Sequence, residues 1–268
     1  MWRVVVLFCL CWLVSPLHAQ TSAPMEPLAL TEAHSQALNT AMRYREDPQG
    51  HLTIDSVRNP SLDWKAVGKS TFNQGYSTSV WWLNFSVRNN GDRELHRYLE
   101  LAYAVLDYVD IYVFDGDKNV GTFELGDMYP FDHRPVESRS FVVPLSWQPG
   151  QVLSIYCRIK TSTSVQAPLT LWQTHAFERE ENNSNIAQGL YYGGMVVIAV
   201  YNLLIFLVLW ERSYLFYVVF VLSLPLFMAS ISGQAFHYIW PRSVAWNDHS
   251  IPFFLGLAFA SSAMFARR

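Results

Sequence analysis

The sequence predicts an exported all-β domain of the sandwich type, followed by an α-helical transmembrane bundle of about three spans. Residues 25–185 have an ordinary polar mixture, and within residues 51–175 short apolar runs alternate with turn signals at intervals of roughly 8–15 residues. The exported domain is expected to span residues 25–178. After about residue 186 the chain is almost free of Lys, Asp and Glu. Charged residues therefore make up only 15% of the 268 residues, against about 25% in a soluble domain. The two parts of the chain are built for different solvents.

Residues 1–19 are predicted to be a secretory signal peptide. Arg3 supplies the positive start, and residues 4–14 form an unbroken apolar core before Ser15 and Pro16. A core of about 11 residues is too short to cross roughly 30 Å of hydrocarbon as a helix. An uncleaved anchor is the alternative. In either case the domain that follows is exported.

Seven strands are expected in the exported domain, separated by turn signals such as Asn90-Gly91 and Asp115-Gly116, which close antiparallel hairpins. A helical period is present only near residues 28–45. The expected strands span residues 80–89, 97–101, 109–115, 122–124, 140–144, 152–160 and 169–172.

Alternation along the first of these strands separates its two faces. Leu83, Phe85 and Val87 share one face, which we expect to be core together with Trp81. The opposite face carries Trp82, with Asn84, Ser86 and Arg88.

Cysteine use is simple. Cys9 and Cys11 lie in the signal peptide, so Cys157 is alone in the exported domain and no disulfide within it can form. Its place in an alternating strand indicates a small core residue. No Cys/His metal spacing occurs, and we expect neither a metal nor a cofactor.

Three uncharged runs, at residues 186–210, 214–232 and 250–266, predict membrane spans, with residues 179–185 as the linker from the exported domain. Export of that domain places Arg212 and the Arg267-Arg268 pair in the cytosol and Arg242 outside, in weak agreement with the positive-inside rule. Three spans form an unusual bundle, so we expect further spans after them.

The composition also restricts function. A net charge of −3 with no basic cluster gives no electrostatic footprint for nucleic acid. No nucleophile elbow or phosphate loop occurs. Two acid pairs, Asp107 with Asp110 and Asp127 with Asp132, could serve an exported hydrolase, although acids at strand ends more commonly cap turns.

The order of these parts resembles bacterial seven-transmembrane receptors with diverse intracellular signalling modules, the 7TMR-DISM family, with their second type of extracellular domain. The residues that carry the resemblance are 82–85, 106–112, 126–134 and 165–169 in the exported part, and 189–194, 201–203, 214–217 and Gly233 in the membrane part. The resemblance implies a jelly-roll sandwich that binds carbohydrate-like or other small ligands. It also implies seven spans and a cytosolic output module, commonly a diguanylate cyclase or a histidine kinase, which this sequence does not contain.

We therefore expect the sensory half of a receptor in the bacterial inner membrane, with a periplasmic domain that binds a small ligand. Expected partners are membrane lipid, that ligand and a second copy of the chain. Two alternatives stay open: a membrane-anchored binding or adhesion module without signalling, and an exported glycoside hydrolase.

We expect Trp82, Asp127, Arg134 and Arg139 to form the rim of the ligand-binding surface. Sugar-like ligands are met by exposed aromatic faces and a few convergent polar groups. In the alternative interpretation, Trp82 covers the segment 28–45 and Arg134 merely neutralises Asp127.

Overall fold

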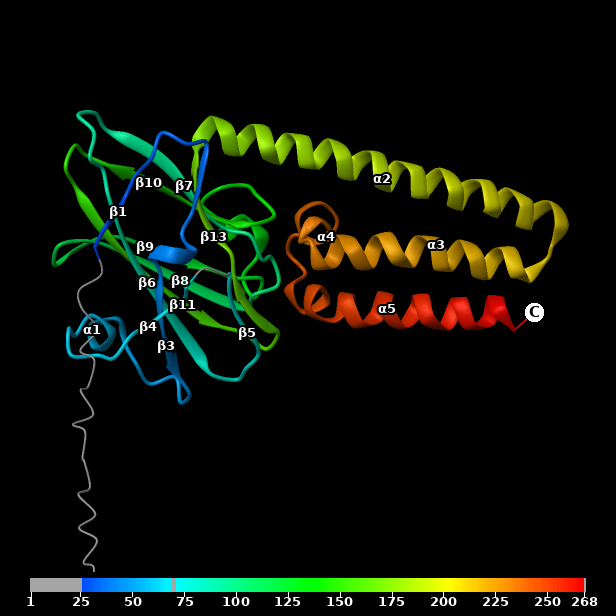
Figure 1. Ribbon diagram of the computed structural model, residues 1–268. Helices are drawn as coiled ribbons and strands as arrows, with labels where there is room; N and C mark the ends of the chain where they lie inside the picture. Colours follow the sequence, from blue (N-terminus) through cyan, green and yellow to red (C-terminus); the bar gives the residue numbers. More distant parts are fainter. Residues whose placement is uncertain (1–25, 69–70, 268) are drawn as a thin grey trace, which may run out of the picture.

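The computed structural model describes residues 26–68 and 71–267. A β-sandwich lies at one end of the molecule, and three long helices extend from it side by side (Figure 1). This confirms the expected order of a sandwich followed by apolar helices. The predicted signal peptide, residues 1–19, lies outside the described residues.

Two sheets and a short strand pair build the sandwich. The larger sheet has the order β4-β3-β6-β11-β8-β9, with β1 paired to β6, and the smaller has the order β10-β7-β13-β2. The remaining strands, β5 and β12, pair with each other. The strands are β1 (Leu28–Ala29), β2 (Ser35–Ala37), β3 (Arg43–Asp47), β4 (Lys65–Ala66), β5 (Phe72–Tyr76), β6 (Val80–Arg88), β7 (Leu95–Leu101), β8 (Tyr108–Asp115), β9 (Lys118–Leu125), β10 (Phe141–Trp147), β11 (Val152–Lys160), β12 (Ser164–Ala167) and β13 (Leu169–Gln173).

All seven expected strands are present, with bounds that differ by a few residues. The helical period near residues 28–45 is not realised, because this segment forms β1, β2, the short 3-10 helix η1 (Asn39–Ala41) and β3. These strands join both sheets: β2 pairs with β13, and β3 pairs with β6. Pairing with strands from distant parts of the sequence overrides the local preference.

The core between the sheets follows the alternation of β6. Leu83, Phe85 and Val87 are fully buried there, and Trp81 lies in the same cluster. Cys157 belongs to it as well, and burial raises the pKa of its thiol. The expected core face of β6 is confirmed.

The opposite face of β6 is also buried from Val80 to Asn84, which corrects the expectation of an exposed Trp82. The side chain of Trp82 is only 1% exposed and packs in a second cluster with Trp64 and Val57. Val57 belongs to the single helical turn α1 (Ile54–Val57), and the segment around it covers this part of the larger sheet. Burial of a large aromatic ring outweighs the polar character of its neighbours on the strand.

The helices are α2 (Thr174–Leu209), α3 (Arg212–Ile231), the short α4 (Gln234–Tyr238) and α5 (Val244–Ala266). Three of them, α2, α3 and α5, are long and apolar enough to cross a membrane. All three helices begin before the expected spans, and each ends within one residue of the expected end. The expected linker 179–185 is helical and continuous with α2, which starts directly after β13. Phe177, in the first turn of α2, is buried against Tyr98 of the smaller sheet, and this contact stabilises the helix at its start.

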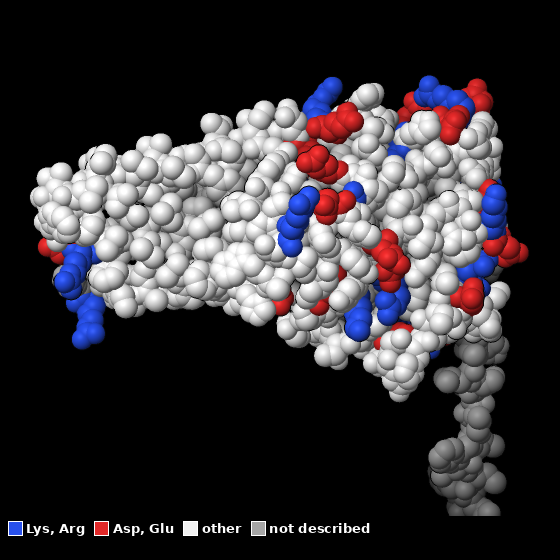
Figure 2. All heavy atoms as spheres, turned by 180° about the vertical axis from the view of Figure 1, so that it is seen from behind, with Lys and Arg blue, Asp and Glu red and all other residues white. Residues whose placement is uncertain are grey.

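The path of the helices explains the charge pattern. Because α2 runs away from the sandwich and α3 returns to it, α4 and the start of α5 lie beside the sandwich (Figure 1). In the view of Figure 2 the middle of the helical rod shows no charged side chain, and charges reappear at its far end. Arg212 begins α3 at that end, whereas Arg242 lies on the side of the sandwich. This arrangement agrees with a sandwich outside the cytosol.

Candidate functional site

The sandwich meets the helices at a junction, by which we mean the loop 126–141, the first turns of α2, and the segment from Ser232 to Arg242 around α4. The loop leaves β9 through Gly126, whose φ of 141° suits glycine. A Cβ at Gly126 would lie 2.0 Å from the carbonyl oxygen of Asp107, so no other residue fits. The next residue, Asp127, donates its backbone N–H to the carbonyl of Leu106 at 2.9 Å, which fixes the start of the loop.

The 3-10 helix η2 (Phe131–His133) makes the contact with the membrane segment. The backbone N–H of Phe131 donates to the carbonyl of Pro241 at 2.8 Å. The ring of Phe131 stacks on the imidazole of His237 with centroids 4.2 Å apart. His237 Nε2 lies 3.3 Å from the carboxylate of Glu137, also in the loop. One buried ring therefore joins the loop to α4.

An exposed ion pair flanks this contact. Arg242 lies 3.7 Å from Asp132, and both side chains are mostly exposed. Such pairs contribute little to stability. A groove of about 510 Å³ lies between the loop and the segment around α4. Its lining residues are Phe131, Asp132, Arg134, Pro135, Glu137, His237, Pro241 and Arg242.

Arg134 stabilises the conformation of the loop 126–141 by hydrogen bonds to the loop's own backbone. Its Nη1 donates to the carbonyls of Ser138 and Arg139, each at 2.8 Å. The guanidinium also lies over the rings of Phe131 and Phe141, 4.5 and 4.6 Å from their centroids. Burial lowers the pKa of Arg134 to about 10, and the negative charge of Asp127 opposes that shift. Arg134 is thus enclosed by its own loop.

Asp127 is a partly buried acid near other acids. Burial raises its pKa to about 7, the negative charge of Asp107 adds to the shift, and Arg134 lowers it. Asp248, on α5, raises it further. The carboxyl of Asp127 therefore changes its protonation in the physiological range, at a place where sandwich and helices meet.

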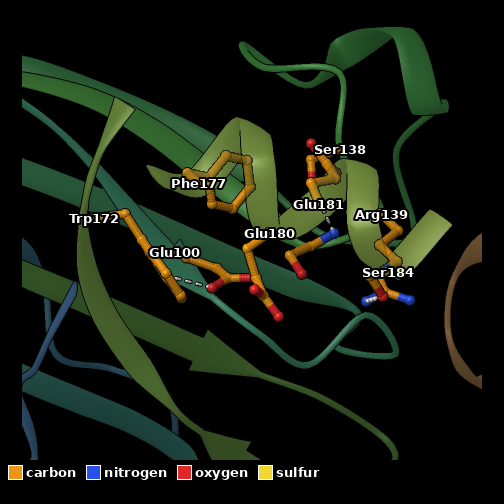
Figure 3. Close-up of a pocket in the computed structure, with 9 residues that line it drawn as sticks. Glu100, Ser138, Arg139, Trp172, Phe177, Glu180, Glu181 and Ser184 are labelled. Carbon is orange, nitrogen blue, oxygen red and sulfur yellow. Dashed lines mark hydrogen bonds between the residues drawn. The ribbon is translucent and has the colours of Figure 1, made fainter. Parts of the chain in front are cut away.

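On the other side of the loop, Arg139 contacts α2. Its Nη2 donates to Ser184 Oγ at 2.8 Å. Both side chains border a small pocket of about 70 Å³, in which the carboxylate of Glu100 also accepts a hydrogen bond from the indole of Trp172 at 2.8 Å (Figure 3). Glu180 and Glu181 of α2, together with Ser138, Ser140 and Phe177, complete its lining. The volume suits a few waters rather than a ligand.

Comparison with known protein families divides the chain where β13 ends and α2 begins. The model described as 7TMR-DISM extracellular 2 matches residues 39–173, and that described as 7TM diverse intracellular signalling matches residues 184–268. The chain belongs to the 7TMR-DISM family. It is therefore a membrane protein with an extracellular, periplasmic sensory domain in a family of signalling receptors.

Other comparisons add little to the 7TMR-DISM assignment. Among curated proteins none matches this chain. One solved structure, the GH31 alpha-xylosidase from Xanthomonas citri, is 12% identical over 51% of this chain and 15% of the xylosidase, with a TM-score of 0.27. This chain thus spans a small fraction of that enzyme's length, and a likeness at this TM-score says nothing about activity.

In this 7TMR-DISM chain, three of the four sequence-predicted site residues gather at the junction: Asp127, Arg134 and Arg139. Trp82 lies apart from them, in the cluster beneath α1. The sequence points to Asp127, Asp132 and Arg134 on either side of Phe131, but not to the roles of Phe131 and His237. No sequence signal marks His237 as a partner, because the contact joins residues about 100 positions apart.

The candidate acid pairs have structural partners. Asp107 accepts hydrogen bonds from Thr161 Oγ1 at 3.1 Å and from the backbone N–H of Ser162 at 2.9 Å. Asp110 pairs with Arg158 at 3.0 Å. Within the described residues, no group of three or more His, Cys, Asp or Glu side chains is arranged to hold a metal ion.

Proposed function

We propose that this chain is the sensory input of a receptor in the bacterial inner membrane. Its periplasmic sandwich binds a small, carbohydrate-like ligand and changes the packing of the helices, which act on a cytosolic output module, either a diguanylate cyclase or a histidine kinase. Membership of the 7TMR-DISM family supports the receptor role. The observation that carries the proposal is the double contact between sandwich and helices, through α2 and through η2.

The covalent contact is rigid. Strand β13 ends at Gln173, and α2 begins at the next residue and runs for 36 residues. Phe177 anchors its start on the smaller sheet. Because a helix transmits displacement and rotation along its length, motion of β13 reaches the membrane part of α2 directly.

The second contact is non-covalent and reaches α3 and α5. Phe131 is held to the segment between these helices by stacking on His237 and by a hydrogen bond to Pro241. A ligand shifts an equilibrium only by its different affinity for the two states, typically about 1–3 kcal/mol of coupling. A contact of one ring and a few hydrogen bonds is of the same order. Two separate contacts let the sandwich move one helix relative to the others.

The test interrupts the rigid contact in the full-length receptor. A flexible Gly-Gly-Ser insert within residues 178–185 should uncouple the sandwich from the output, because a flexible segment does not transmit rotation. Cellular output, as cyclic dinucleotide concentration or kinase phosphorylation, is expected to move to a fixed level that no longer responds to growth conditions. The same insert after Gly116, in the turn between β8 and β9, is the control. Unchanged signalling with the insert in α2 would contradict the proposal.

A further inference from the structure

A cluster of aromatic and polar side chains lies on the outer face of the larger sheet, at the end that leads into the junction loop. We call it the tyrosine platform, and it consists of Tyr108, Asp110, Glu124, Tyr129 and Arg158. The register of the strands places Asp110 of β8 between Arg158 of β11 and Glu124 of β9. Tyr108 precedes Asp110 by two residues and so points to the same face.

The tyrosines present an open aromatic surface. Tyr108 is 37% exposed, although it lies in a strand of a large sheet. Tyr129 stands edge-on to it, with ring centroids 5.8 Å apart and planes at 85°. The ring of Tyr129 is in turn stacked on His133, at 4.9 Å and 24°. The rings are thus held in place while part of their surface stays in solvent.

Polar groups beside the rings offer both donors and acceptors. Arg158 Nη1 donates to Asp110 at 3.0 Å, and both side chains are partly exposed. Glu124 is exposed next to them. Partial burial, with the charges of Glu124 and Asp110, raises the pKa of the Tyr129 phenol, so this group remains a hydrogen-bond donor.

One part of this face is closed. Towards β3 and β6 the sheet is covered by the segment around α1, under which Trp64 and Trp82 are buried. The ring that sequence reasoning selected, Trp82, is therefore unavailable to a ligand, whereas Tyr108 on the same face is open. Exposed aromatic rings with a few convergent polar groups are typical of ligand sites.

We propose that the tyrosine platform binds the ligand of this receptor, a neutral saccharide. The apolar face of a sugar ring would pack on Tyr108, and its hydroxyls would donate to Asp110 and Glu124 and accept from Arg158. The two carboxylates outnumber the one guanidinium, so an anionic ligand would be repelled. This inference rests on the proposed receptor function and gives its ligand a place.

The platform is connected to the junction by η2. Its last residue, His133, stacks on Tyr129 of the platform, and its first residue, Phe131, stacks on His237 of α4. A ligand that moves Tyr129 therefore moves a helix of three residues whose opposite end touches the membrane segment. Ligand binding and the second contact between sandwich and helices share one element.

The experiment uses the purified chain in lipid nanodiscs, with cellotriose, maltotriose, xylotriose and N,N′,N″-triacetylchitotriose as probes and digalacturonic acid as the charged comparison. Saturation-transfer NMR at up to about 10 mM detects weak binding. At least one neutral probe should bind. Tyr108→Ala and Glu124→Gln, both at exposed positions, should weaken that binding about tenfold or more. The control is Tyr76→Ala, because Tyr76 is an 82% exposed tyrosine on β5, outside the platform.

Two outcomes would overturn the proposal: no neutral probe binds, or a neutral probe binds equally well to the wild type and to Tyr108→Ala. Neither outcome affects the proposed coupling of the sandwich to a cytosolic output, which is tested by the insert in α2 and its effect on output. If a saccharide binds as expected but that insert leaves signalling unchanged, the platform stands and the receptor proposal fails.

Discussion

The ring of Phe131 lies flat against the imidazole of His237, with centroids 4.2 Å apart and planes at 13°. The first residue belongs to a loop of the sandwich and the second to a short helix between two membrane spans. Glu137, 3.3 Å from His237 Nε2, adds a polar contact to the same pair. Movement of the loop is thereby coupled to α3 and α5 without a covalent connection.

Removing the ring should loosen this contact. Phe131→Ala should cost about 3–5 kcal/mol in stability, because Phe131 is buried and a cavity would replace its ring. Hydrogen exchange should become faster for the backbone amides of residues 234–240. Phe131→Leu is the control, since it keeps most of the apolar volume without the stacking. Unchanged exchange in the Ala variant would show that Phe131 does not hold α4.

Gly233 should resist substitution. It has a φ of 76°, and a Cβ there would lie 2.8 Å from the Cβ of Ala104 and 3.1 Å from the carbonyl oxygen of Arg139. Gly233→Ala should therefore lower stability by about 1–2 kcal/mol or more, through strain and the loss of close approach to the sandwich. Thermal unfolding in detergent measures this. Gly256→Ala on α5 is the matched control, because nothing lies within 4 Å of its Cβ position; equal effects of both substitutions would contradict the close-contact argument.

Asp127 should make stability depend on pH. Its pKa is raised from an ordinary value of 3.8 to about 7, so between these values the folded state holds a proton that the unfolded state has lost. Stability from this group is then highest at low pH and falls as pH rises towards 7. Asp127→Asn should remove that dependence and stabilise the protein at pH 8 by about 2 kcal/mol, with little effect near pH 4. Denaturant unfolding at pH 4, 6 and 8 tests this; a variant that is less stable than wild type at pH 8 would refute the raised pKa.

Trp82 should behave as part of the scaffold. Trp82→Ala should cost about 3–5 kcal/mol, because the indole is buried under α1. Trp82→Phe should cost much less, since the indole Nε1 has no hydrogen-bond partner among the described residues and an aromatic ring is retained. Chemical denaturation of both variants gives the comparison. A small loss in the Ala variant, together with weaker saccharide binding, would return Trp82 to the ligand site.

Several features of this protein could be predicted from the sequence because they depend on local pattern. The alternation in β6 placed Leu83 and Phe85 in the core, since side chains on a strand point alternately to its two faces. Long uncharged runs identified the membrane helices, since only an apolar segment of sufficient length is stable in hydrocarbon. Two signals of this kind were enough for the class of fold and, with the resemblance, for the family.

The tertiary structure decided what depends on residues far apart in the sequence. Trp82 is buried rather than exposed because the segment around Trp64 folds over it, and no periodicity in that segment foretells this. The pKa of Asp127 is raised first by burial and then by the charges of Asp107 and Asp248, which the fold brings near it from two other parts of the chain. Burial and charge act through space, so the side chains that determine the junction and the open end of the sheet are known only once the strands have paired and the helices have returned to the sandwich.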